Sequence, residues 1–125
     1  MKLERIDHLV LTVQNIDNSC KFYSLALGME VITFGEGRKA LRFGQQKINL
    51  HQKGKEFLPN AKNADVGTVD ICFVTHTPIE DVKVHLQSLN IELESDVVKR
   101  SGAIGSILSI YLRDPDGNLL EISNY

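Results

Sequence analysis

The pattern that decides the fold is a strand that occurs twice, as Ile6-Asp7-His8-Leu9-Val10-Leu11-Thr12-Val13 and as Val69-Asp70-Ile71-Cys72-Phe73-Val74-Thr75. His8 of the first stretch and Asp70 of the second are 62 residues apart. The same offset carries Gly28, which follows the first predicted helix, onto Asn90, where the second predicted helix ends. Similar stretches at a fixed offset indicate an internal repeat. We therefore expect two copies of one structural unit.

Each copy is predicted to contain one strand, one helix and then three more strands. Alternating apolar residues bounded by turn residues predict strands at 6–13, 29–34, 38–43 and 47–52 in the first copy, and at 68–75, 91–95, 107–113 and 118–124 in the second. In the first copy, apolar residues recur at helical intervals over residues 16–27. Asn15 or Asp17 can cap this helix, and Gly28 can end it in a left-handed conformation. The second helix is predicted to begin at the capping box Thr77-Pro78-Ile79-Glu80.

The predicted fold is α+β, a single domain over residues 1–125 built from tandem βαβββ repeats. We expect the repeats to form a cupped mixed sheet with the helices on the outside. Module 1 spans about residues 4–52, a connecting loop spans 53–67, and module 2 spans 68–125. A loop of this length without helix or strand periodicity is typical of a linker or a functional loop.

Composition excludes several classes of protein and is that of an ordinary globular domain. Apolar residues make up 42% and charged residues 24% of the chain, which argues against disorder. The net charge of -2, without a basic block, argues against nucleic acid as a partner. No apolar run approaches the roughly 18 residues that a membrane span needs. Without a signal peptide pattern, the expected location is the cytoplasm, and exposed sheet edges lead us to expect a homodimer.

Four strands each leave one metal-capable side chain on the face away from the helices. Alternate residues of a strand point to opposite faces, so the apolar residues that pack against the helices fix where the polar ones point. The residues selected in this way from the first, fourth, fifth and eighth strands are His8, His51, Asp70 and Glu121. Two imidazoles and two carboxylates suit a divalent ion such as nickel, zinc, iron, manganese or cobalt. We expect these four side chains to surround one ion.

The same residues resemble the vicinal oxygen chelate superfamily, which includes glyoxalase I, fosfomycin-resistance proteins, extradiol dioxygenases and bleomycin-resistance proteins. The resemblance covers nearly the whole chain and rests on Asp7-His8-Leu9-Val10-Leu11, Phe22-Tyr23, Leu27-Gly28 and Asp114-Pro115-Asp116-Gly117-Asn118-Leu119-Leu120-Glu121. Within the superfamily, the chain resembles a subgroup of glyoxalase-domain or virulence-associated proteins through Arg38-Lys39-Ala40-Leu41, Lys47-Ile48-Asn49-Leu50-His51 and Ser109-Ile110-Tyr111-Leu112-Arg113-Asp114-Pro115.

The resemblance implies a metal held from the first, fourth, fifth and eighth strands, which by position are again His8, His51, Asp70 and Glu121. It implies glyoxalase-like lyase or isomerase chemistry, in which the metal chelates neighbouring oxygens of a small molecule. Glu121, with Asp70 as the second choice, is expected to move a proton next to the carbonyl. The chain departs from the family pattern, because the fifth-strand ligand is most often His and the fourth-strand ligand is often Glu.

Two other functions stay open. An extradiol-type dioxygenase needs iron or manganese held by two His and one carboxylate, which His8, His51 and Glu121 can supply while Asp70 supports them or binds weakly. A metal-free protein that sequesters a drug or metabolite, as bleomycin-resistance proteins do, needs no such ligands. The ion site can form within one chain or, if the units swap, across a dimer.

Substrate contacts are expected from the seventh predicted strand and from the loop before it. Ser109, Tyr111 and Arg113 share the face opposite the apolar residues of that strand. Arg100 lies beside a glycine-containing loop that can close over a ligand. Arginine side chains at these positions favour an anionic substrate such as a carboxylate or phosphonate.

Overall fold

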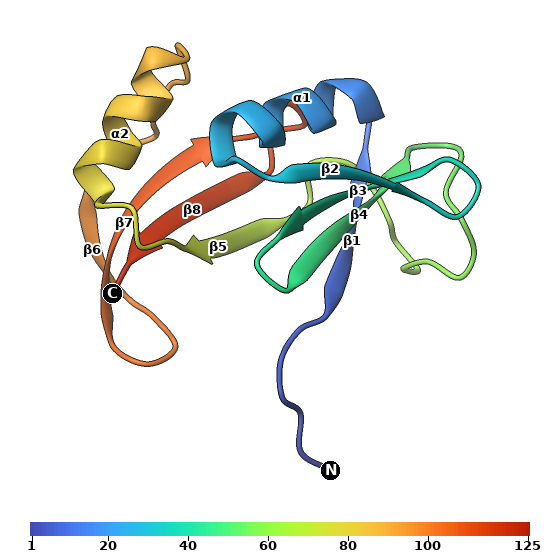
Figure 1. Cartoon of the computed structure of the whole chain (residues 1–125), viewed down its shortest axis with the longest axis horizontal. Coiled ribbons are helices and arrows are strands. Elements are labelled where there is room, and N and C mark those ends of the chain that lie inside the picture. The colour runs from blue at the N-terminus through green and yellow to red at the C-terminus, as the bar shows by residue number, and fades with distance from the viewer. The chain divides into compact units, whose positions relative to one another are not determined.

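The computed structural model describes residues 1–125, and the chain divides into two units, Met1–Gly67 and Thr68–Tyr125. The first unit contains β1 (His8–Val13), α1 (Ile16–Leu27), β2 (Glu30–Phe34), β3 (Arg38–Phe43) and β4 (Gln46–Gln52). The second contains β5 (Asp70–Val74), α2 (Ile79–Ser88), β6 (Val98–Ser101), β7 (Ser106–Arg113) and β8 (Leu119–Asn124). Both units therefore have the predicted βαβββ order, and each can be followed along the chain in Figure 1.

The two sheets have the same topology. The strand order is β1-β4-β3-β2 in the first unit and β5-β8-β7-β6 in the second. In each sheet the first and last strands of the unit run parallel, and the other neighbours run antiparallel. The α+β fold predicted from the sequence is confirmed, with a four-stranded mixed sheet and one helix in each unit.

The helices cover one face of each sheet and leave the other face to polar side chains. In the first unit α1 packs against β2, β3 and β4, and in the second α2 packs against β7 and β8. The fully buried apolar residues of these layers include Tyr23, Leu41 and Leu50 in the first unit and Leu86 and Ile110 in the second. Because strand residues alternate between faces, burying this apolar set directs the polar residues of the same strands to the opposite face.

The ends of the helices follow the sequence in part. The side chain of Asn15, and not that of Asp17, caps α1 by accepting a hydrogen bond from the Asn18 N–H at 2.9 Å. Gly28 has φ 66°, the left-handed conformation predicted for it, and the repeat-related Asn90 is also left-handed, with φ 58°. The capping box at Thr77 is wrong: α2 begins at Ile79 after Pro78 and has no side-chain cap.

The sixth strand lies further along the chain than predicted. Residues 91–95 form only an isolated bridge, between Leu93 and Leu112, whereas β6 spans Val98–Ser101. β6 pairs with β7 as a hairpin that starts at the Ser101–Ser106 pair. The tight turn that closes this hairpin fixes which residues become the strand, and alternation of apolar residues does not reveal that choice.

A buried turn locks β5 beside β8. The carboxylate of Asp114 accepts hydrogen bonds from the N–H groups of Asp116 and Asn118, each at 2.9 Å. The fully buried Asn118 side chain donates to Asp114 Oδ2 at 2.8 Å and accepts from the Val69 N–H at 2.9 Å. The turn therefore fixes the register in which Cys72 lies opposite Glu121.

Candidate functional site

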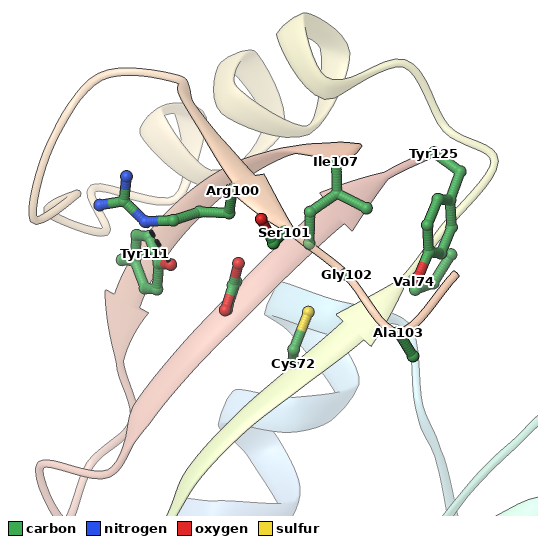
Figure 2. A pocket seen from close by; sticks show the side chains of 10 residues that line it. Cys72, Val74, Arg100, Ser101, Gly102, Ala103, Ile107, Tyr111 and Tyr125 are labelled. Atoms are coloured by element: carbon green, nitrogen blue, oxygen red, sulfur yellow. Dashed lines mark hydrogen bonds between the residues drawn. The ribbon is translucent and has the colours of Figure 1, made fainter. Parts of the chain in front are cut away.

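In the second unit, three functional side chains lie in one row across neighbouring strands. Cys72 of β5 pairs with Glu121 of β8, and Glu121 pairs with Tyr111 of β7. Arg100 of β6 lies opposite Ile107, outside this row, but its side chain reaches the row, because its Nε donates to the Tyr111 hydroxyl at 3.2 Å. Figure 2 shows Arg100 and Tyr111 close together, with the Cys72 thiol further along the same hollow.

The Tyr111 phenol is held in its protonated form. Burial raises the pKa of Tyr111, the hydrogen bond from Arg100 opposes this shift, and the neighbouring Glu121 carboxylate raises the pKa again. A phenol with a raised pKa keeps its proton at neutral pH. Tyr111 can therefore donate a hydrogen bond to an oxygen of a bound molecule.

A hydroxyl and thiol network surrounds Glu121 on its other side. The Ser123 hydroxyl lies 3.4 Å from Glu121 Oε1, 3.2 Å from the Cys72 Sγ and 2.7 Å from the Ser109 hydroxyl. Burial raises the pKa of the Cys72 thiol, and the Glu121 and Asp70 carboxylates raise it further. The thiol is therefore neutral at neutral pH and is not an activated nucleophile.

These residues line a hollow of about 370 Å³. Its lining comes entirely from the second unit: Cys72, Val74, Arg100, Ser101, Gly102, Ala103, Ile107, Tyr111, Glu121 and Tyr125. Figure 2 shows the β6–β7 loop crossing this hollow near the Tyr125 ring. The Tyr125 hydroxyl accepts a hydrogen bond from the Ile104 N–H at 3.1 Å, so the C-terminal residue holds this loop. A hollow of this size suits a small molecule.

Two of the predicted substrate contacts lie elsewhere in the second unit. Ser109 is fully buried and hydrogen-bonded to Ser123, and it does not line the hollow. Arg113 donates to Glu94 Oε1 at 2.9 Å and to the Gly117 carbonyl at 3.2 Å, so its side chain is bound to the turn between β7 and β8. Arg100 and Tyr111 are the two predicted substrate contacts that do line the hollow.

Asp70 lies diagonally across the strand pair from Glu121. Asp70 pairs with Leu119, and Glu121 is two residues further along β8 on the same face. Diagonal neighbours on a sheet face are within reach of each other's side chains. The exposed Asp70 and the half-buried Glu121 are therefore suitably placed as two ligands of one cation.

In the first unit, His8 is accessible and paired. Its side chain is 46% exposed, and its Nδ1 lies 2.8 Å from Asp7 Oδ2. The hydrogen bond to His8 is the main cause that lowers the pKa of Asp7, with Arg5 and Lys47 adding to it. A carboxylate on Nδ1 orients the ring and leaves Nε2 available for a ligand.

His51 is buried and has no hydrogen-bond partner. It is 2% exposed, and neither ring nitrogen has a partner. Burial lowers the pKa of His51, and the positive charge of Arg38 lowers it further. Asn49 on the same face is 7% exposed, and its Oδ1 also lacks a partner. Since buried polar atoms nearly always have a partner, these orphaned atoms fit a site that a ligand or ion completes.

The strand register does not bring His8 and His51 together. His8 pairs with Lys47, and His51 pairs with Thr12 at the other end of β1. Their pairing positions are therefore four residues apart, or roughly 13 Å along the strands. The diagonal neighbour of His8 is Asn49, two residues beyond Lys47.

Asn49 is thus the functional candidate that sequence reasoning missed. The diagonal from His8 to Asn49 in the first unit corresponds to the diagonal from Asp70 to Glu121 in the second. The repeat itself contained a signal for Asn49. In each copy the first and last strands pair in parallel, so Asn49 of β4 occupies the position of Glu121 in β8. Side-chain chemistry alone favoured His51, which points to the same face.

The types of donor atom that each unit offers suit a divalent ion. Neither unit by itself brings three His, Cys, Asp or Glu side chains together. Asp70 and Glu121 supply carboxylate oxygens in the second unit, and His8 or His51 supplies an imidazole in the first. Imidazole and carboxylate ligands suit zinc, iron, manganese, nickel and cobalt. The four-residue metal centre remains a prediction.

Comparison with known proteins identifies the family. A model described as the Glyoxalase/Bleomycin resistance protein/Dioxygenase superfamily matches residues 5–122. The chain therefore belongs to this superfamily, as its resemblance to vicinal oxygen chelate proteins predicted. It is 54% identical over its whole length to glyoxalase domain-containing protein RDO1 of Mycosarcoma maydis, 70% of which it covers. It is 52% identical to virulence protein STM3117 of Salmonella typhimurium, 87% of which it covers.

Solved structures agree with this assignment. The crystal structure of STM3117 matches with a TM-score of 0.99 and 52% identity, covering 100% of this chain and 99% of that chain. An integron cassette protein from the mobile metagenome of V. cholerae matches with a TM-score of 0.98 and 51% identity, covering 100% and 98%. A lactoylglutathione lyase from Agrobacterium tumefaciens, at 22% identity and a TM-score of 0.76 over 99% and 96%, shares the fold.

Neither helix has the length and apolar character needed to cross a membrane.

Proposed function

We propose that this chain is a metal-dependent enzyme of the superfamily that acts on a small molecule by glyoxalase-like lyase or isomerase chemistry. The observation that carries the proposal is the 370 Å³ hollow of the second unit, in which the Glu121 carboxylate lies between the Tyr111 phenol and the Cys72 thiol. A carboxylate beside a protonated phenol is a pairing of a proton acceptor with a proton donor.

Of the four predicted ligands His8, His51, Asp70 and Glu121, we propose that Asp70 and Glu121 bind the ion with one imidazole, from either His8 or His51, because the register separates the two histidines along the strands. Asn49 is an additional candidate in the first unit. A bound divalent ion supplies a Lewis acid for neighbouring oxygens of the substrate. The diagonal of Asp70 and Glu121 supports the two carboxylate ligands. The orphaned nitrogens of His51 and the orphaned Oδ1 of Asn49 support a ligand on the polar face of the first unit.

The protein residues have distinct proposed roles. Glu121 accepts a proton from the carbon next to the substrate carbonyl and returns it to the adjacent carbon. Tyr111 donates a hydrogen bond to a substrate oxygen, which its raised pKa permits. Arg100 is exposed at the rim and holds the Tyr111 hydroxyl in place through the 3.2 Å hydrogen bond. The β6–β7 loop, held by Tyr125, limits the access of water.

The test compares Glu121→Gln with Glu92→Gln, an exposed glutamate outside the hollow. Metal content is measured after dialysis against nickel, manganese or zinc, and deuterium exchange from solvent is measured on a panel of α-hydroxy and α-oxo carbonyl compounds. We expect Glu121→Gln to lose metal and to slow exchange by roughly 10²–10⁴-fold, as removal of an acid–base group does. Glu92→Gln should match the unaltered protein.

Two results would contradict the proposal. Glu121→Gln that keeps full metal content and full exchange would remove Glu121 from both roles. Unaltered protein that binds no metal but binds small molecules would instead indicate a metal-free sequestering protein. The two-histidine trio of an extradiol-type dioxygenase is less favoured, because the register separates His8 and His51 along the strands.

We also propose that the chain functions as a homodimer in the cytoplasm. Edge strands β1 and β5 carry the exposed apolar side chains Val10 and Val74, which are 44% and 56% exposed. Apolar side chains on unpaired edges favour association with a second chain. Sedimentation velocity at micromolar concentrations should show a dimer, and a monomer at every concentration would contradict this part of the proposal.

A further inference from the structure

Two cations in the first unit lie around one aromatic ring on the polar face of the sheet. Lys47 Nζ of β4 is 3.9 Å from the centroid of the Phe34 ring, and Arg38 Cζ of β3 is 5.0 Å from the same centroid. Arg38 also lies 4.4 Å from the centroid of the Phe57 ring. We call Arg38 and Lys47 the cation pair. Both side chains are half-buried, so their charges are screened less than those at the surface.

No acidic side chain neutralises the cation pair. Arg42, on the same strand as Arg38, donates to Glu30 Oε2 at 3.1 and 2.6 Å, whereas neither Arg38 nor Lys47 forms an ion pair. Lys47 contributes to lowering the pKa of Asp7 without forming an ion pair with it, and Asp7 is already paired with His8 and Arg5. The rings therefore fix the Arg38 guanidinium while its N–H donors remain free for an acceptor.

Buried polar atoms beside the cation pair also lack partners. His51, 2% exposed, stacks edge-to-face on Phe57 at 5.4 Å, and neither of its ring nitrogens is hydrogen-bonded. Asn49, 7% exposed, lies opposite Ala40 on β3 and has an unpartnered Oδ1. Two cations without an anion and three buried polar atoms without partners lie on one face. An anionic oxygen balances the two charges and accepts a hydrogen bond from the ring N–H of His51, whereas Asn49 Oδ1, itself an acceptor, needs a donor group of the same molecule.

We propose that this face of the first unit binds the anionic head group, a carboxylate or phosphonate, of a small organic molecule through Arg38 and Lys47. Arg38 offers paired N–H donors to two oxygens, Lys47 supplies a second charge, and the Phe34 and Phe57 rings contact the apolar part of the molecule. The inference goes beyond the proposed function, because it gives the first unit a ligand site of its own and names small organic anions as the class of ligand.

The test titrates metal-stripped protein with benzoate and with phenylphosphonate at constant ionic strength, observed by NMR. The variants are Arg38→Gln, Lys47→Gln and, as the matched control, Arg42→Gln, whose guanidinium is already paired with Glu30. Loss of one charge-assisted contact should weaken binding about 10-fold or more for the first two variants. Arg42→Gln should stay within about two-fold of the unaltered protein. The tighter of the two probes identifies the head group.

Three results would overturn the inference: no binding of either probe by the unaltered protein, equal affinities for the unaltered protein and Arg38→Gln, or equal weakening by Arg42→Gln. Arg38→Lys keeps the charge and should retain part of the affinity, which separates lost recognition from lost folding. The Glu121→Gln variant separates the two proposals. Anion binding by a protein that takes up no metal and shows no exchange would leave this inference standing while the proposed function fails. Metal uptake and exchange that are lost in Glu121→Gln, with no binding of either probe by the unaltered protein, would do the reverse.

Discussion

Replacing Asn118 with alanine should lower the free energy of unfolding by about 2.5–6 kcal/mol. The Asn118 side chain is fully buried, donates to Asp114 Oδ2 at 2.8 Å and accepts from the Val69 N–H at 2.9 Å. A hydrogen bond to a charged group contributes roughly 1.5–3 kcal/mol, and a buried N–H without an acceptor costs roughly 1–3 kcal/mol. Alanine removes the first and creates the second, and the two contributions give the stated range.

Urea unfolding followed by circular dichroism measures this change by linear extrapolation. The control is Asn60→Ala, because Asn60 is exposed and its amide donates only to the Phe57 carbonyl at 3.3 Å. The control should change the free energy by less than about 0.5 kcal/mol. A double-mutant cycle with Asp114→Ala should show coupling of about 1 kcal/mol or more. A loss below about 1 kcal/mol in Asn118→Ala, or simple additivity in the cycle, would refute the reasoning about this turn.

Three further predictions concern stability, titration and loop dynamics. Burial lowers the pKa of His51, so the folded chain binds fewer protons at this residue than the unfolded chain. The free energy of unfolding should therefore fall as the pH drops below about 6.5. An NMR titration in which His51 titrates at or above that pH would contradict this prediction. Tyr125→Phe removes the acceptor of the Ile104 N–H and should speed exchange of that amide in hydrogen-exchange NMR, and an unchanged rate would exclude the role of Tyr125 in holding the loop. Leu86→Ala should lower the free energy of unfolding in urea by about 2–5 kcal/mol, because Leu86 is fully buried. Val84 is 66% exposed, so Val84→Ala should lower it by less than about 0.5 kcal/mol. Equal effects of the two substitutions would contradict the burial pattern of α2.

Local signals predicted most of the fold. The apolar period placed α1 at its observed bounds, with its cap left open between Asn15 and Asp17, and the turn glycines bounded β3 at Arg38–Phe43. The offset that relates Gly28 to Asn90 located the end of the second helix, and both residues are left-handed in the structure. These features depend on neighbouring residues alone, so the sequence contains them. The predicted position of the sixth strand was wrong, because that position depends on which residues pair with β7. Such pairing is a contact between segments that are separate in the sequence.

The sequence predicted which face of the sheet the candidate residues occupy, but it did not predict which of them are neighbours on that face. Alternation directed Asn49 and His51 to the same side of β4, since they are two residues apart. Only the register of β4 against β1 shows that Asn49 is the diagonal neighbour of His8. Arg113 was likewise expected to contact a substrate from its face of β7, but its side chain binds Glu94 and the Gly117 carbonyl. These partners depend on contacts within the folded unit that the strand pattern does not reveal.

Anomalous diffraction from a crystal grown with manganese tests the central claim most directly. The proposed function predicts a peak about 2.0–2.2 Å from a carboxylate oxygen of Glu121, with an imidazole nitrogen of His8 or His51 among the other ligands. Crystals of Glu121→Gln should lack the peak. A metal-loaded crystal whose peak lies away from Glu121 and from both histidines would contradict the proposed site.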